Sequence, residues 1–402
     1  MTVRFFETFL AIVLLNLAPA YGRAEDAPIK LGVLTDLSGI YSSSTGPGAV
    51  EAARMAIEDF GGSVLGRKIE LISADHQNKP DVGLAILSRW YDVENVSAVF
   101  ELVNSTIALG AFKMSQEKNR IAVVTGSGSS ELTGKGCVPN GFQWVWDTES
   151  LGRAIGSSVT KQGGTSWFFL TVDYSFGRQL EADASSAIKA AGGTVVGSVK
   201  FPSGTADFSS FLLTAQSSGA KVIGFAAGGQ DLINLIKQAH EFGLNNDGTK
   251  LVGFITLIAD VRAVGLEMAS GLVLLEAFYW DLNDETRQWS RRFFEKRKAM
   301  PSMIQAGVYS SVLHYLKAVD AAGTIEANVV SKKMRQLPVN DFFARDGKIR
   351  ADGLLIHDVH LFEAKIPTQS KGAWDLYNLV RTTKGDEIYA AQPQATCATA
   401  ER

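Results

Sequence analysis

Two successive series of short apolar runs, each alternating with amphipathic helical stretches, constrain the fold of this 402-residue chain more than any other feature. The runs are rich in Val, Ile and Phe, which is typical of parallel strands buried beneath helices. The first series predicts strands at 29–34, 68–74, 97–102, 121–125 and 142–146. It predicts helices near 47–60, 80–92, 105–118 and 149–162. The series is about the size of one α/β domain.

The same pattern begins again at residue 166. The second series predicts strands at 166–173, 194–201, 221–227, 250–256 and 271–278, with helices after the first four. It resembles the first series in spacing and order. We therefore predict an α/β protein with two similar lobes, each a doubly wound parallel sheet.

The rhythm changes after residue 278. Helices are predicted at 284–300, 304–322 and 328–336, and strand-like segments at 353–365 and 375–382. Because no third parallel series follows, we expect this part of the chain to return to the two lobes.

Such a chain path would join the lobes by a three-segment hinge. Its crossings are predicted near Asp147, near Tyr279 and within 340–360. The predicted domains are 25–147 with about 279–345 for lobe 1, 148–278 with about 346–370 for lobe 2, and a C-terminal tail to 402 that returns to lobe 1.

The first residues have the composition of an export signal. Arg4 precedes a mostly apolar run, and the small residues Gly22 and Ala24 follow at the spacing that signal peptidases prefer. We predict that residues 1–24 are a cleaved signal peptide and that the mature protein is periplasmic. Glu7 is an atypical residue in that run, and an uncleaved membrane anchor is the alternative, although the run is shorter than the about 20 residues that a spanning helix needs.

Export bears on the two cysteines, Cys137 and Cys397. An oxidising compartment allows them to form a disulfide, which would close a long loop and stabilise the fold in the chain-entropy model. Two unrelated free thiols are the alternative, because spacing in the sequence does not show proximity.

Charge and motifs argue against several classes of function. The formal net charge is −3, so no excess of basic residues calls for nucleic acid or an anionic membrane. The segment 126–136 fails as a phosphate loop, because Ser129 stands where a Gly is needed and Gly136 replaces the Mg²⁺-binding Ser or Thr. His357 and His360 fall on opposite faces of a predicted strand. No nucleophile and base stand together, so we predict no enzyme, no metal and no cofactor.

Small, hydroxyl-bearing or amide residues follow most predicted strands of both lobes. In open parallel sheets, ligands bind beyond the carboxyl ends of the strands, where helix N-termini present backbone N–H groups. Tyr41, Tyr174 and Phe176 are the large exceptions in these segments, and they could form an aromatic wall. Ordinary helix capping is the alternative for any single residue. The segments are 36–44, 76–81, 103–106, 126–132, 173–177, 202–208, 228–231 and 256–260.

The sequence "IKLGVLTDLSGIYSSSTGPGAVEAARMAIEDFGG" at 29–62, followed in order by 65–92, 104–134 and 171–212, resembles a known family. It is similar to the solute-binding proteins of ABC importers in the leucine/isoleucine/valine-binding class, which are type I periplasmic binding proteins. The resemblance implies two α/β lobes joined by three crossovers and a small-molecule ligand trapped between them by hinge closure. It also implies permease subunits of the inner membrane as partners.

The resemblance also implies ligand-binding positions. The block 126–128 matches the loop that receives a ligand carboxylate, and Phe176 stands where amino-acid binders of the family usually have Tyr. The implied positions are Ser38, Gly39, Tyr41, Asn104, Ser105, Gly126, Ser127, Gly128, Phe176, Gly228, Gly229 and Gln230, to which Tyr174 and Thr256 are added.

One departure from the family bears on the ligand. Thr256 and Leu257 stand where amino-acid binders have an acidic residue that holds the ligand ammonium. Burying an ammonium without a counter-charge is costly, and Asp231 or Asp260 could replace the acid or could equally be helix caps or surface charges. The predicted solute is therefore an amino acid or an amino-acid-like or aromatic carboxylate.

Two other functions remain open at this stage. A ligand-sensing periplasmic protein that reports to a membrane receptor would use the same clamp. An exported hydrolase would need Asp75, His76 or Asp173 as catalytic groups.

Overall fold

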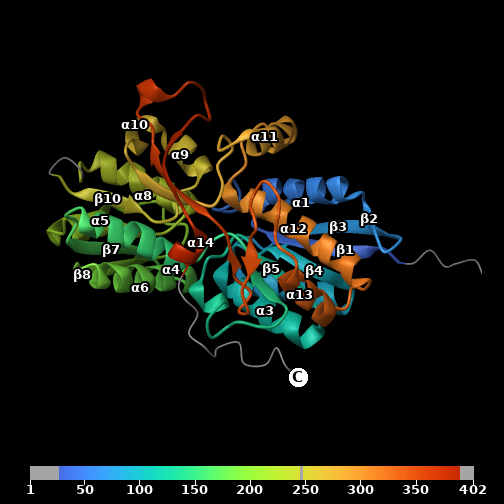
Figure 1. The fold of residues 1–402 in the computed structure, drawn as a ribbon. Helices are drawn as coiled ribbons and strands as arrows, with labels where there is room; N and C mark the ends of the chain where they lie inside the picture. The colour runs from blue at the N-terminus through green and yellow to red at the C-terminus, as the bar shows by residue number, and fades with distance from the viewer. Residues whose placement is uncertain (1–26, 245–247, 390–402) are drawn as a thin grey trace, which may run out of the picture.

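The computed structural model describes residues 27–244 and 248–389. Two α/β units lie side by side, one drawn mostly in blue and orange and the other mostly in green and yellow (Figure 1). We name them the large-sheet unit and the small-sheet unit, after a six-stranded sheet of order β2-β3-β1-β4-β5-β6 and a four-stranded sheet of order β10-β9-β7-β8. The predicted fold class is confirmed.

The six-stranded sheet is parallel except for the short edge strand β2. Its central strands are buried on both faces. Ala98 and Phe100 of β4 pack with α1 and α12, whereas Val99 packs with α2 and α3 on the opposite face. The bounds are β1 (Ile29–Thr35), β2 (Ser63–Val64), β3 (Arg67–Asp75), β4 (Val96–Glu101), β5 (Ile121–Val124), β6 (Gly141–Gln143), α1 (Gly46–Phe60), α2 (Pro80–Asp92), α3 (Ser105–Lys118) and α12 (Met303–Ala322).

The four-stranded sheet is entirely parallel. Three aromatic rings fix its packing, because Phe169 stacks on both Trp167 and Phe254 with centroid distances of 6.1 and 5.9 Å. The bounds are β7 (Ser166–Val172), β8 (Thr194–Phe201), β9 (Val222–Ala226), β10 (Lys250–Gly253), α6 (Ser175–Ala190), α7 (Ser209–Ser217) and α8 (Gly229–Glu241).

The strand predicted at 271–278 exists, but the prediction that it pairs with the second parallel sheet is wrong. β11 (Val273–Glu276) instead runs antiparallel to β14 (Val359–Ala364), which pairs antiparallel with β15 (Tyr377–Thr383). An unbroken apolar run indicates a buried strand but does not indicate the direction of its partner. β10 therefore remains at the edge of its sheet.

Two other expectations need correction. The helix predicted at 149–162 is divided into α4 (Thr148–Leu151), the π-helical turn η2 (Gly152–Gly156) and α5 (Ser157–Lys161). A Cβ on Gly152 would lie 2.9 Å from the backbone of Ala184, so helix α6 approaches closely at this point. The strand predicted at 142–146 ends at Gln143, after which the chain leaves the sheet.

The remaining elements follow the two sheets or connect them. They are η1 (Ser130–Leu132), α9 (Ile258–Val264), α10 (Leu266–Ala269), α11 (Asp284–Arg297), α13 (Ala327–Gln336), β12 (Lys348–Ile349), β13 (Leu355–Ile356), η3 (Pro367–Gln369) and α14 (Gly385–Ile388). Helix α11 is tied to α1 by a paired contact of Arg292 with Asp59, which also accepts from the Tyr309 hydroxyl at 2.7 Å.

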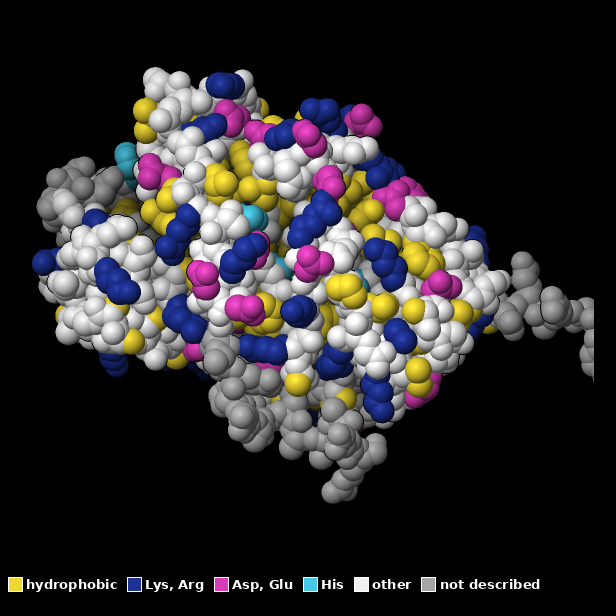
Figure 2. Space-filling model, viewed as in Figure 1, with side chains coloured by type: hydrophobic (Ala, Val, Ile, Leu, Met, Phe, Trp, Pro, Cys, Tyr) yellow, Lys and Arg dark blue, Asp and Glu magenta, His cyan; other side chains and the backbone are white. Residues whose placement is uncertain are grey.

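Several sequence predictions fall outside this description. The predicted signal peptide and the last residues of the C-terminal tail, 390–402 with Cys397, lie outside the described residues. The disulfide of Cys137 with Cys397 therefore stays a prediction. The lobe boundaries and the three-segment hinge also stay predictions. Among the helices that the structure describes, none is long and apolar enough to span a bilayer. On the face shown in Figure 2, acidic and basic side chains are interspersed.

Candidate functional site

A cavity with about 410 Å³ of atom-free space lies between the two sheets. The segments that line it follow strands of both sheets, and the start of α12 completes the wall. The lining residues are Tyr41, Ser44, Thr45, Val103, Gly126, Trp146, Tyr174, Phe176, Gly228, Gly229, Ile255, Leu257 and Ile304.

The loop after β1 is folded by a buried carboxylate. Asp36 accepts hydrogen bonds from the backbone N–H groups of Gly39 at 2.7 Å and Tyr41 at 3.1 Å. The Thr45 hydroxyl then donates to the Tyr41 carbonyl at 3.0 Å. These bonds fix the backbone of the loop, so the Tyr41 ring is held at the cavity wall.

Tyr41 meets Tyr174, which precedes α6 on the small-sheet unit. Their hydroxyl oxygens are 2.6 Å apart. Burial raises the pKa of both phenols above the ordinary value, so both are neutral at physiological pH. A direct hydrogen bond therefore joins the two units across the cavity.

A second link between the units involves the backbone. The Gln230 N–H donates to the Ile40 carbonyl at 3.1 Å. The preceding residue, Gly229, has φ of +60°, and a Cβ there would lie 2.5 Å from the Ile40 oxygen and 2.8 Å from Tyr41 Cδ1. Glycine is thus needed both for the backbone conformation and for the close approach of the opposite loop.

A third set of contacts joins the units away from the cavity wall. Asp183 of α6 accepts from the Ser130 hydroxyl at 2.8 Å, which is the contact between the units. The Thr148 hydroxyl of α4, which packs on α6, also donates to Asp183 at 2.5 Å. Gln179 also donates to the Ser130 hydroxyl at 3.0 Å. The structure therefore represents an arrangement in which the two units touch on several sides of the cavity.

No residue in the cavity wall carries an ionisable acid or base other than the neutral tyrosines. Asp231 accepts from the Gly204 N–H at 3.0 and 3.2 Å, and burial raises its pKa to about 6. Asp260 accepts from the Leu257 N–H at 2.9 Å, and burial raises its pKa to about 7. Both acids hold backbone segments, and neither lines the cavity.

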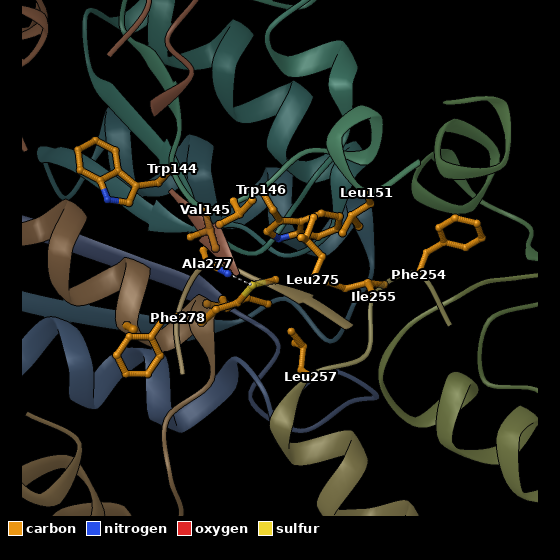
Figure 3. Packing of buried hydrophobic residues seen from close by; sticks show 14 of the residues in the cluster. Trp144, Val145, Trp146, Leu151, Phe254, Ile255, Leu257, Leu275, Ala277 and Phe278 are labelled. Atoms are coloured by element: carbon orange, nitrogen blue, oxygen red, sulfur yellow. Dashed lines mark hydrogen bonds between the residues drawn. The ribbon is translucent and has the colours of Figure 1, made fainter. Parts of the chain in front are cut away.

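Thr256 also lies outside the wall. Its hydroxyl donates to the Gly253 carbonyl at 3.2 Å, within its own segment. Its neighbours Ile255 and Leu257 line the cavity instead. Figure 3 shows these two side chains opposite Trp146. Successive side chains of an extended segment point in opposite directions, so Ile255 and Leu257 face the cavity while Thr256 faces away from it.

Several predicted residues support the wall from behind. Ser105 and Ser127 pair through their hydroxyls at 2.8 Å. The Asn104 side chain caps α3 by accepting from the Thr106 and Ile107 N–H groups at 3.0 and 3.1 Å. The Ser38 hydroxyl donates to Asp75 at 2.6 Å. None of these four predicted residues lines the cavity.

The structure thus brings together part of the predicted set. Tyr41, Gly126, Tyr174, Phe176, Gly228 and Gly229 line the cavity, whereas Ser38, Gly39, Asn104, Ser105, Ser127, Gly128, Gln230 and Thr256 do not. Ser44, Val103 and Leu257 line the cavity and lie in the predicted segments 36–44, 103–106 and 256–260, although they are not among the predicted positions. Sequence reasoning missed Thr45, Trp146, Ile255 and Ile304.

The groups that a hydrolase would need do not meet at the cavity. Asp75 accepts from Ser38 and from the backbone of Leu37 and Gln77. Burial lowers the pKa of His76 to about 4, and its Nδ1 accepts from a backbone N–H at 2.9 Å. No group of three or more His, Cys, Asp or Glu residues in the described ranges could hold a metal ion.

A family model for periplasmic binding proteins matches residues 28–373. The chain belongs to the periplasmic binding protein family. It is 43% identical to a periplasmic binding protein of Burkholderia mallei, with a TM-score of 0.90 over 92% of this chain and 98% of that one. It is 38% identical to a branched chain amino acid ABC transporter periplasmic ligand-binding protein of Burkholderia xenovorans, with a TM-score of 0.81 over 92% and 99% of the two chains.

A curated relative agrees with this assignment. The Leu/Ile/Val-binding protein homolog 7 of Brucella suis is 25% identical over 341 residues, which cover 79% of this chain and 84% of the relative. The resemblance to type I periplasmic binding proteins of the leucine/isoleucine/valine-binding class is therefore confirmed. This periplasmic binding protein has a solute-binding role, and the cavity between its sheets is the candidate site.

Proposed function

We propose that this periplasmic binding protein is the extracytoplasmic solute-binding component of an ABC importer. It captures a small amino-acid-like or aromatic carboxylate in the cavity by hinge closure and delivers it to permease subunits in the inner membrane. It does so without a cofactor. The observation that carries the proposal is the cavity between the two units, with the Tyr41–Tyr174 hydroxyl contact of 2.6 Å across it.

The cavity wall has the chemistry that such a solute needs. Val103, Ile255, Leu257 and Ile304 offer apolar surface for a hydrocarbon body. The helices α1, α8 and α12 each contribute wall residues at or next to their N-termini. The N-terminus of a helix carries a partial positive charge, so these three termini favour an anionic group in the cavity.

The contacts between the units are suited to reversible closure. The Tyr41–Tyr174 and Gln230–Ile40 hydrogen bonds each contribute about 0.5–1.5 kcal/mol net. Such weak bonds leave the closed arrangement dependent on the solute, since a ligand shifts an equilibrium only by its differential affinity for the two states. A transport component must also release its solute, which tighter closure would oppose.

A thermal-shift screen tests the binding function. The mature protein is unfolded and refolded to remove any solute carried from the cell, then heated with leucine, valine, other amino acids, aromatic acids, urea and short amides. A solute at a hundred times its Kd stabilises the folded state by about 2.7 kcal/mol, which raises Tm by several degrees. If no small organic solute raises Tm, the binding proposal is wrong.

An uptake assay then separates the importer from the alternatives. Cells that lack this gene should take up the radiolabelled solute more slowly, and the gene supplied on a plasmid should restore uptake. Unchanged uptake with a lost transcriptional or chemotactic response would favour the ligand-sensing protein. Chemical conversion of the solute by the purified protein would favour the hydrolase.

A further inference from the structure

Trp146 lines the cavity and carries a hydrogen-bond donor that has no partner. This donor, Nε1, is buried. The indole nitrogens of Trp144 and Trp167, by contrast, donate to hydroxyl oxygens at 3.1 Å. Trp289 shares the lack of a partner, but it does not line the cavity. Buried donors in native proteins are nearly always paired, so the free N–H of Trp146 requires an explanation.

The Trp146 ring is held in one orientation. Its Cε3, Cζ3 and Cη2 atoms pack so closely over Gly128 that any Cβ there would overlap them. The Phe176 ring meets it edge to face at a centroid distance of 6.1 Å. The nitrogen lies on the edge of the indole opposite to these three atoms, so the N–H points away from Gly128. In the view of Figure 3, the Trp146 ring lies above Leu275, Ile255 and Leu257.

Ser44 supplies a second unpaired group on the same wall. Its hydroxyl oxygen is buried without a partner. The backbone around it is fixed, because the Ser44 N–H donates to the Tyr41 carbonyl at 3.1 Å and the Ser44 carbonyl accepts from Ser302 at 2.6 Å. The backbone N–H and carbonyl of Ser44 are therefore both engaged with other groups, and the hydroxyl oxygen has no partner of its own.

The tyrosine pair contributes a third donor. Two phenol groups carry two hydroxyl hydrogens, and the contact between Tyr41 and Tyr174 uses only one of them. The other hydrogen remains available to an acceptor near the wall. The cavity therefore has spare donors from three different segments of the chain.

The cavity wall itself carries no carboxyl group. Besides burial, Asp36 and Asp231 act on the two wall tyrosines from behind, raising the pKa of both phenols, but neither acid lines the cavity. Another acid behind the wall is Glu101, whose Oε1 occupies the space that a side chain at Gly126 would fill. Burial raises the pKa of Glu101 to about 8, so this carboxyl is protonated and neutral at pH 7. A ligand ammonium would have to leave water without a counter-ion on the wall, which costs several kcal/mol.

We propose that Trp146 Nε1 and Ser44 Oγ donate hydrogen bonds to an oxygen of the solute, so that the cavity selects a small organic acid that has an apolar body and no ammonium group. This inference rests on the proposed solute-binding function. It assigns the selectivity to two side chains. Ser44 lies in the first predicted segment, 36–44, and Trp146 lies in none of the predicted segments.

Two matched pairs of solutes test the class of ligand. Isothermal titration of the refolded protein compares 4-methylpentanoate with leucine and phenylacetate with phenylglycine, which differ only by the amino group. We expect at least one acid to bind more than tenfold tighter than its amino acid. Tighter or equal binding of the amino acids would overturn the inference. If neither acid binds, the inference is also wrong, and the wider thermal-shift screen still decides independently whether the protein binds any solute.

Single substitutions test the two donors. Trp146→Phe keeps an aromatic ring over Gly128 and removes the N–H, and Ser44→Ala removes the hydroxyl. Each should weaken binding of the preferred acid by roughly 10- to 100-fold, the usual effect of losing a hydrogen bond to a charged group. The Tm and circular dichroism spectrum of each variant show whether it folds.

Trp144→Phe is the matched control. It deletes the same chemical group from the indole that donates to Ser310 at 3.1 Å, within the core. It should lower Tm and leave Kd unchanged. If Trp146→Phe behaves in the same way, its N–H has only a structural role, such as pointing at the Phe176 ring, and the assignment is refuted.

Discussion

Replacing Gly229 by alanine should weaken solute binding in addition to destabilising the fold. The φ of +60° at this position places alanine in the left-handed region, which costs about 1–2 kcal/mol. The added Cβ would also lie 2.5 Å from the Ile40 carbonyl oxygen and 2.8 Å from the Tyr41 ring. Both neighbours belong to the opposite unit, so this second effect acts only when the units are in contact.

The size of the binding defect can be worked from the contacts that must separate. Relieving the overlap breaks the Gln230–Ile40 hydrogen bond of 3.1 Å and disturbs the Tyr41–Tyr174 contact of 2.6 Å. Each neutral hydrogen bond contributes about 0.5–1.5 kcal/mol, so closure loses about 1–3 kcal/mol. Because about 1.4 kcal/mol corresponds to a tenfold change, Kd should rise by roughly 5- to 150-fold.

Gly219→Ala provides the control for the backbone effect alone. Gly219 has φ of +64° on the same unit, and a Cβ there would meet no atom within 4 Å. Urea unfolding should show similar losses of stability in the two variants. Titration with the solute that gives the largest thermal shift should show a raised Kd only for Gly229→Ala. If the two variants have Kd values within twofold of each other, the contact does not contribute to closure and the reasoning is refuted.

Three further predictions concern other parts of the molecule. Burial raises the pKa of Glu101 from 4.5 to about 8, so the stability that the protonated carboxyl contributes is complete below pH 4.5 and is lost as the pH rises through 8. Urea unfolding of Glu101→Gln should therefore depend less on pH between 5 and 8 than that of the wild type. A double-mutant cycle of Tyr41→Phe and Tyr174→Phe should give a coupling of about 1 kcal/mol in binding free energy, and additive effects would argue against the contact. Finally, reduction of the predicted Cys137–Cys397 disulfide should lower stability by about 2–4 kcal/mol, whereas thiol titration of two free cysteines in the unreduced, unfolded protein would contradict the pairing.

Much of the fold could be predicted because local signals coincide with the ends of elements. Helix α2 begins at Pro80, whose missing N–H costs nothing in the first turn, and α3 begins after the Asn104 cap. The pairing of β11 could not be predicted, because it depends on β14, which lies more than eighty residues later in the chain. The break at η2 depends on how closely α6 approaches Gly152, which no local pattern records.

The site was predicted less completely, because the rule used to find it identifies segments of the chain and does not identify the side chains that face the cavity. The rule that ligands meet the carboxyl ends of strands found Tyr41, Tyr174 and Phe176. The rule does not determine which side chains of a loop point toward the ligand. It therefore predicts Thr256 as a ligand-binding residue, whereas Ile255 and Leu257 line the cavity. Trp146 is the last residue of the predicted strand 142–146, and Ile304 comes from a helix outside both strand series.

The unpaired donors at the cavity also bear on how binding and closure are coupled. In the proposed mechanism, Ser44 and Trp146 meet water when the units separate and lose it when they close. An unsatisfied buried polar group costs about 1–3 kcal/mol, so these two atoms alone disfavour the closed arrangement by about 2–6 kcal/mol without a solute. Changing the closed fraction from 1% to 99% takes about 5.5 kcal/mol. A solute whose oxygen accepts from both donors removes this penalty, whereas an apolar molecule of the same shape does not. The groups that select the solute are therefore the same groups that make closure depend on it.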